Sequence, residues 1–144
     1  MPVIAFAQGT TIKATATMHP DGTRSTTVTD PDKRTTEETW LDASGKTLRR
    51  IVYPLDERDM PAGANVFDKN GKLTYKSTYT RDSADRIGDE TIYSANGQML
   101  RRRVYQYDAR NKISGVEEYD AKGTLIPRAV EKTSPARPDK KKKR

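Results

Sequence analysis

The sequence predicts an all-β protein: an antiparallel array of β-hairpins with a 26-residue period, arranged as an elongated meander sheet or a solenoid with a thin core. Three observations predict this class. Glycines recur every 26 residues, the segments between them alternate β-favouring and polar residues, and only 33% of the 144 residues are apolar whereas 33% are charged. So few apolar residues favour a repeat structure, in which each unit buries only a narrow strip of apolar surface against its neighbours.

The period is visible in several columns of equivalent positions. One column holds four glycines: Gly45, Gly71, Gly97 and Gly123. A second column holds three tyrosines: Tyr53, Tyr79 and Tyr105. A third column holds three aspartates: Asp56, Asp82 and Asp108. Because independent columns keep the same spacing, the repeat does not depend on the chance spacing of glycine alone.

The repeat domain is predicted to span residues 10 to 130 and to hold about ten short antiparallel strands. Apolar and polar residues alternate from Ile12 to Met18, and His19-Pro20-Asp21-Gly22 then turns the chain. Gly22 precedes Gly45 by 23 residues, so this first hairpin is interpreted as a degenerate copy or a cap. Each later period contains two strands and two turns.

Two kinds of turn are predicted to alternate along the array. Gly45, Gly71 and Gly97 supply the left-handed backbone that tight turns need, and the pair Asn96-Gly97 predicts a type I′ turn. The second kind begins at the aspartate column, where a carboxylate can accept a hydrogen bond from the backbone two residues on. Such capping needs no ligand. It is favoured over a row of calcium sites, because basic residues are interleaved with these carboxylates.

Several of these units resemble known repeats. Residues 67–73, 107–113 and 119–125 resemble the Tyr-Asp-x-x-Gly-(Arg/Lys)-Leu unit of Rhs/YD repeats. They also resemble the second variant of MORN repeats, in which a glycine precedes the aromatic residue, as Gly63, Gly88 and Gly115 do here. The resemblance covers about residues 40–126, and Asn111 and Ser94 depart from it. It implies a β-hairpin scaffold of a secreted or surface protein, with no catalytic residues to carry over.

Two short segments flank the predicted repeat domain. Residues 1–9 contain Ala5-Phe6-Ala7 before Gln8, which has the form of a signal-peptidase site, and are interpreted as an export-signal remnant or an N-terminal strand. The export interpretation predicts a secreted, periplasmic or cell-surface protein. Residues 131–144 are predicted to be a disordered basic tail. No apolar run approaches the roughly 18 residues that span a bilayer, so no transmembrane segment is predicted.

The net charge of +7 is concentrated in that tail. Residues 132–144 hold seven basic residues and one acidic residue, a net charge of +6, which leaves +1 for residues 1–131. The balanced body does not favour a nucleic-acid groove, and no specific nucleic acid is expected as a partner. The candidate residues for binding an anionic polymer or surface are Lys140, Lys141, Lys142, Lys143 and Arg144, with Arg101, Arg102 and Arg103 in the array.

The tyrosine column has two interpretations. If successive hairpins stack in register, the three rings form a ladder beside arginines such as Arg49 and Arg101, which would suit sugars or other polymers. The favoured interpretation is that the tyrosines pack as the inner face of the sheet, because aromatic columns in β arrays usually pack.

No catalytic or cofactor chemistry is recognisable. The chain has no cysteine and a single histidine, His19, which is expected to be a solvated turn residue, so neither a nucleophilic triad nor a zinc site is predicted. No cofactor is expected. The favoured prediction is a non-enzymatic binding or structural module for an unknown protein or cell-surface polymer. A polyanion binder acting through the tail is the alternative, and a carbohydrate-active enzyme is a third hypothesis.

Overall fold

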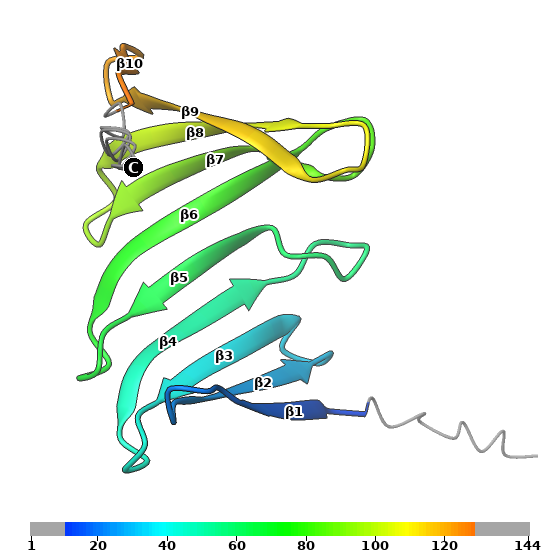
Figure 1. Ribbon diagram of the computed structural model, residues 1–144, viewed down its shortest axis with the longest axis vertical. Helices are drawn as coiled ribbons and strands as arrows, with labels where there is room; N and C mark the ends of the chain where they lie inside the picture. Colours follow the sequence, from blue (N-terminus) through cyan, green and yellow to red (C-terminus); the bar gives the residue numbers. More distant parts are fainter. Residues whose placement is uncertain (1–10, 129–144) are drawn as a thin grey trace, which may run out of the picture.

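The computed structural model describes residues 11–128, which form one ten-stranded antiparallel sheet. The strands are β1 (Lys13–Met18), β2 (Arg24–Asp30), β3 (Thr35–Leu41), β4 (Thr47–Pro54), β5 (Gly63–Phe67), β6 (Leu73–Arg81), β7 (Ile87–Ser94), β8 (Met99–Tyr107), β9 (Ile113–Asp120) and β10 (Leu125–Ile126). Each strand pairs with the next one in the chain, and Figure 1 shows them following one another along the long axis of the molecule. The predicted all-β class is confirmed, as an open meander sheet.

The predicted export-signal remnant, residues 1–9, and the predicted basic tail, residues 131–144, lie outside the described residues. Residues 11–128 contain no helix that is long and apolar enough to cross a membrane.

The hairpin turns all have one geometry, which differs from the predicted type I′. Nine described residues have positive φ, and each occupies the fourth position of a hairpin turn. At the predicted type I′ site, the Gly97 N–H donates to the Ser94 carbonyl at 2.9 Å and the Ser94 N–H donates to the Gln98 carbonyl at 2.8 Å. Gly97 has a φ of 90° and Asn96 is not among the residues with positive φ. The loop is therefore a three-residue turn whose left-handed last residue, Gly97, forms a bulge with Gln98 opposite Ser94. A separate register shift follows between the two strands that the turn joins, β7 and β8.

Aspartate side chains stabilise this longer turn, as predicted for the aspartate column. The Oδ1 atoms of Asp56, Asp82 and Asp108 accept hydrogen bonds from the backbone N–H two residues on, at 2.8 to 2.9 Å. The same oxygens accept the N–H four residues on, at 3.0 to 3.1 Å. Asp42, Asp68 and Asp120 cap three of the glycine turns in the same way. Both kinds of turn are thus stabilised by the same hydrogen bonds from backbone N–H groups to an aspartate side chain.

The core is thin and lies on one face of the sheet. Among the described residues, the buried ones other than Gly63 are Ile51, Ala64, Val66, Ser77 and Ile92. They face one another across neighbouring strands, so they share one side, here called the core face; the opposite side is called the far face. Extensive strand contacts join only consecutive strands, so no second layer covers the sheet within residues 11–128.

The tyrosine column contributes to this core. Tyr53 and Tyr79 pack against the cluster of Ile51, Ala64 and Val66. The interpretation of the tyrosines as part of the packed face is confirmed for these two rings. The apolar side chains of a single sheet would otherwise be exposed to solvent. Here the two aromatic rings shield them, as a second layer of structure usually does.

Candidate binding surface

The core face carries a half-exposed tyrosine column. Tyr53, Tyr79 and Tyr105 lie on β4, β6 and β8, with Tyr79 opposite Glu90 and Tyr105 opposite Val116 on the neighbouring strands. All three residues are half-buried. The strand register places each tyrosine two residues along the strand from the position directly in line with the one before it. Because neighbouring strands are about 4.8 Å apart and the rise is about 3.4 Å per residue, the tyrosines recur diagonally about every 12 Å. The tyrosines therefore form a diagonal column rather than the in-register ladder, and all three remain partly accessible to solvent.

A hollow of about 180 Å³ opens at one end of this column. It is lined by Tyr79, Ile87, Glu90, Tyr105, Tyr107 and Ile113, and it is called the tyrosine hollow below. The Tyr105 hydroxyl donates to Glu90 Oε2 at 2.6 Å, and the Tyr107 hydroxyl donates to the carbonyl of Ile87 at 2.6 Å. The Glu90 side chain is only 12% exposed, and Arg103 Nη1 lies 3.7 Å from its Oε2. The hollow therefore holds a fixed carboxylate whose charge is balanced.

The surroundings keep the phenols of the tyrosine column protonated. Burial raises the pKa of Tyr105 to about 12, and the Glu90 carboxylate adds to the shift as hydrogen-bond acceptor and as a nearby negative charge. Burial likewise raises the pKa of Tyr53 to about 12, with the charge of Glu38 contributing. The pKa of Tyr79 is also raised, again mainly by burial. The three tyrosines of the column are therefore neutral hydrogen-bond donors at neutral pH.

Ion pairs and arginine–aromatic contacts of the far face recur after 52 residues, which is twice the sequence period. On the far face, Arg50 pairs with Glu37 at 3.1 Å and its guanidinium lies 4.5 Å from the ring centre of Phe67. Fifty-two residues later, Arg102 pairs with Asp89 at 2.9 Å and lies 6.0 Å from the ring centre of Tyr119. The structural unit is therefore four strands rather than two.

Sequence reasoning missed the acidic residues of this larger unit. Glu38 and Glu90 are also 52 residues apart and both lie on the core face, but the intervening period has Ala64 at the same position. A search for columns that are kept in every second period would have found them. Their partners could not have been assigned from spacing alone.

The three predicted anion-binding arginines of β8 lie on two different faces. Arg101 and Arg103 point to the core face, opposite Ile92 and Glu90, whereas Arg102 points to the far face. Each has a carboxylate partner: Glu118 for Arg101, Asp89 for Arg102 and Glu90 for Arg103. The run therefore does not form one uncompensated basic surface. The other predicted anion-binding residues, Lys140 to Arg144, lie outside the described residues.

The single histidine is not the solvated turn residue that was expected. Its ring stacks on Trp40 with a centroid distance of 4.7 Å and an interplanar angle of 12°, and His19 Nε2 lies 3.0 Å from Ser25 Oγ. The Arg49 guanidinium lies 5.0 Å from the Trp40 ring centre. The expectation was wrong because Trp40 faces Ser25 across the strands, which brings the indole beside the residue that opens the first turn. A second aromatic cluster thus lies on the core face.

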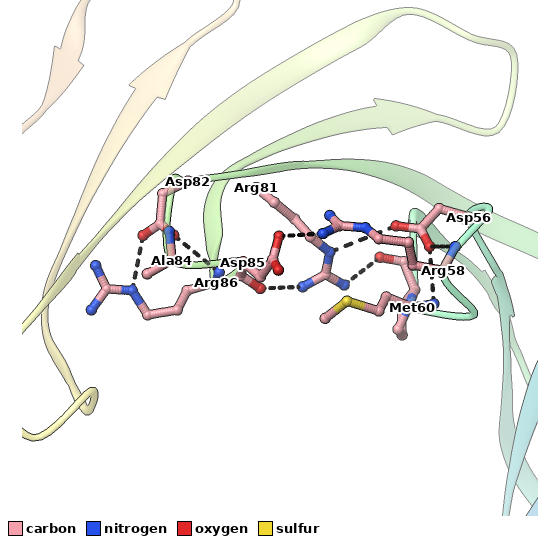
Figure 2. A network of polar contacts seen from close by, with 9 residues as sticks. Asp56, Arg58, Met60, Arg81, Asp82, Ala84, Asp85 and Arg86 are labelled. Carbon is pink, nitrogen blue, oxygen red and sulfur yellow. Dashed lines mark hydrogen bonds and ion pairs between the residues drawn. The ribbon is translucent and has the colours of Figure 1, made fainter.

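The aspartate turns lie at one end of the strands, and arginine side chains connect neighbouring turns (Figure 2). Arg58 Nη1 lies 2.7 Å from Asp85 Oδ1, so this ion pair connects two successive aspartate turns. Arg81 donates to the carbonyl of Pro61 at 2.7 Å and to that of Asp85 at 3.0 Å. These carboxylates are occupied by backbone N–H groups and arginines. Among residues 11–128 no group of three or more His, Cys, Asp or Glu side chains is arranged to hold a metal ion.

No protein-family model matches the chain, and no curated protein matches it.

Proposed function

We propose that the chain is a non-enzymatic, exported β-repeat protein that binds an uncharged, extended polysaccharide along its core face. The observation that carries the proposal is the half-exposed tyrosine column beside the tyrosine hollow, on a sheet whose described residues include no covering layer. Binding sites for small molecules and sugar units combine apolar and aromatic walls with a few fixed polar groups, and this surface has both.

The chemistry of the hollow favours a neutral, hydroxyl-rich ligand. The rings of Tyr79, Tyr105 and Tyr107 offer apolar faces on which a sugar ring can stack. Glu90 and Arg103 offer an acceptor and a donor for hydroxyl groups, and because their charges compensate one another neither an anion nor a cation is favoured. The diagonal recurrence of about 12 Å between tyrosines suits an extended polymer with a regular repeat.

The test compares the two faces of the sheet. Tyr105→Leu removes a ring of the core face, and Tyr119→Leu removes a matched ring of the far face. We expect Tyr105→Leu to weaken binding to soluble, uncharged polysaccharides such as β-glucan, mannan or xylan by about fivefold or more, as loss of one stacked ring predicts. Tyr119→Leu should leave the affinity unchanged. Isothermal titration calorimetry measures both variants, after circular dichroism has shown that each retains the sheet.

Two results would contradict the proposal. One is that the parent protein binds none of these polysaccharides. The other is an equal loss of affinity in the two variants, which would mean that binding does not depend on the core face.

Export is supported by the small-x-small triplet Ala5-Phe6-Ala7 in the sequence. Recovery of the protein from the periplasmic or extracellular fraction of the cells that make it would agree with the proposal. Confinement to the cytoplasm would contradict it.

A second candidate function is binding to polyanions through the predicted basic tail. It is favoured by the charge distribution, because residues 132–144 carry a net charge of +6 whereas residues 1–131 carry +1. The ion pairs of β8 also favour the tail as the anion-binding part. Carboxylates compensate the charges of Arg101, Arg102 and Arg103, so β8 has little excess positive charge.

A further inference from the structure

The outer edge of β1 is an open sheet edge whose single safeguard is Lys13 at the start of the strand. β1 pairs with β2 on one side, and no other described strand lies on its other side. All six of its residues are exposed; its last residue, Met18, is 70% exposed, and Ile12, which precedes the strand, is 58% exposed. Natural edge strands are commonly protected by charges, proline or a bulge. From Ala14 to Met18 this strand has none of these, and its pairing with β2 is regular.

The hairpin fixes which backbone groups point away from the sheet. The His19 N–H donates to the Thr23 carbonyl at 2.9 Å, so His19 and Thr23 form the first hydrogen-bonded pair of β1 and β2. Hydrogen-bonded and non-hydrogen-bonded pairs alternate along antiparallel strands. Thr17, Thr15 and Lys13 therefore direct their backbone groups toward β2. Ala16 and Ala14 direct theirs to the open edge.

This edge is self-complementary when two copies are placed antiparallel. In the register centred on Thr15, Ala14 faces Ala16 of the second copy, Ile12 faces Met18, and Lys13 faces Thr17. The outward N–H and carbonyl groups of Ala14 and Ala16 then meet the same groups of the second copy as hydrogen-bonded pairs, and Thr15 faces Thr15 as a non-hydrogen-bonded pair. Among the symmetric registers, this one overlaps the whole segment 12–18.

The side chains also match in this register. Ala14 lies opposite Val28, on the far face, so Ile12, Ala14, Ala16 and Met18 form an apolar row that meets its own copy. Lys13, the charged residue of the strand, lies opposite Thr17 of the second copy. The two Lys13 residues are separated by four positions along the strand, about 13 Å. Pairing therefore buries exposed apolar side chains and brings no like charges into contact.

We propose that β1 is a dimerisation edge whose partner is β1 of a second copy of this chain. The dimer has two-fold symmetry, with the axis perpendicular to the sheet at Thr15, and it joins the two ten-stranded sheets into one continuous sheet. Both core faces then lie on the same side. The proposal does not depend on what the core face binds.

Single-cysteine variants test the register directly, because the chain has no native cysteine. Residues that face each other in non-hydrogen-bonded pairs have Cα atoms about 4.5 Å apart, which is within disulfide range. Under mild oxidation we expect full-length Thr15→Cys to form a covalent dimer on a non-reducing gel. Thr17→Cys lies on the same face of the same strand but is opposite Lys13 of the second copy, so it should remain largely uncrosslinked. Equal crosslinking of the two variants, or crosslinking of Thr17→Cys alone, would overturn the proposal.

Solution mass tests the interface without any crosslink. Light scattering should give twice the chain mass of 16.2 kDa for the parent protein. Ala16→Pro removes an outward N–H without removing a bond to β2, and Ala16→Lys adds a charge at the centre of the interface, so each should give a monomer with an unchanged circular dichroism spectrum. A parent protein that is monomeric at the highest concentration reached, or an Ala16→Lys variant that remains a dimer, would overturn the proposal.

Discussion

At the scale of single residues, glycine meets two different requirements in this sheet. Gly97 is needed for its backbone angle, because a φ of 90° strains any residue with a side chain. Gly63 is needed for space. A Cβ atom at Gly63 would lie 2.2 Å from the carbonyl oxygen of Ser77 on the neighbouring strand, a distance at which the two strands would have to separate.

This difference predicts unequal effects of the same substitution. Gly63→Ala should lower the free energy of unfolding by about 2 kcal/mol or more, because the added methyl group displaces backbone rather than a flexible side chain. Gly88→Ala is the matched control. Its nearest neighbours would be 3.6 Å away, an ordinary contact, so its effect should be within about 0.5 kcal/mol. Urea denaturation measures both, and equal midpoints would show that β5 and β6 do not approach as closely as described.

Residue identity also limited what could be predicted about the turns. The five positive-φ glycines mark their turns, because glycine adopts this angle without strain. Asp59, Asp85 and Asn111 also have positive φ, which Asp and Asn tolerate better than most residues. Arg34 has a φ of 52° and occupies the same position in the turn after β2. Nothing in its chemistry favours this angle, so the sequence does not mark Arg34 as the left-handed residue, although Asp30 and Pro31 before it are typical turn residues.

At the scale of the hairpin, the capping aspartate connects the two ends of each turn. Asp42 accepts hydrogen bonds from the N–H of Ser44 and of Lys46, both at 2.9 Å, and from the Ser44 hydroxyl at 2.6 Å. The Ser44 hydroxyl and the Lys46 N–H are the main causes that lower the pKa of Asp42 below its ordinary value. The charged carboxylate is therefore the form that closes the turn.

The lowered pKa predicts a pH-dependent effect of Asp42→Ala. Because the pKa in the folded state lies below the unfolded value of about 3.9, the carboxylate stabilises the fold above that pH, and this contribution is lost as pH falls through the folded-state pKa. At pH 7 the variant should have a lower denaturation midpoint than the parent protein. The difference should shrink toward zero in acid. Glu57→Ala, at a position that does not open its turn, is the control and should match the parent at both pH values.

A difference between Asp42→Ala and the parent protein that is the same at pH 7 and in strong acid would contradict this explanation. The turn would then depend on the size or conformation of the side chain rather than on its charge.

The hairpins could be predicted from sequence because the turns occupy fixed columns. The type of turn could not, because a three-residue loop with a bulge and a two-residue type I′ loop can end in the same Asn-Gly pair. The tyrosine column was predicted, and the packing of Tyr53 and Tyr79 on the core cluster agrees with the favoured interpretation. The Glu90 contacts were not predicted. They depend on the strand register and on a unit of four strands, neither of which a 26-residue column reveals.

At the scale of the whole molecule, the open sheet and a solenoid could not be distinguished from the sequence. Both give the same turns and the same alternation, and the difference depends on how consecutive hairpins pack. The charge distribution, by contrast, could be read directly. The body is nearly neutral, and the arginines of β8 have carboxylate partners, so electrostatic attraction to polyanions is expected from the tail.

Truncation after Glu131 tests the role of the tail. The truncated protein should keep its thermal midpoint, because residues 132–144 contain almost no apolar side chains. It should lose most of its binding to immobilised heparin. If Lys140 to Arg144 make five phosphate-like contacts, the affinity of the intact chain should fall on the order of 10²- to 10³-fold between 50 and 200 mM salt.

The matched control is an intact chain in which Lys140 to Lys143 are replaced by glutamine. It should behave like the truncated protein on heparin. If the truncated protein instead elutes at the same salt concentration as the intact chain, the tail makes no contribution, and the arginines of β4 and β8 become the candidates for anion binding.

The connection of each strand only to its neighbours in the chain has a mechanical consequence. Tension between the two ends of the chain would act on β1 and β10, at opposite edges of the sheet (Figure 1), and would peel them away one strand at a time. The load would then act on a few hydrogen bonds at once instead of on a whole row in shear. Each 26-residue repeat would release on the order of 90 Å of extended chain. The protein would therefore yield in steps at low force and act as an extensible link rather than a rigid strut.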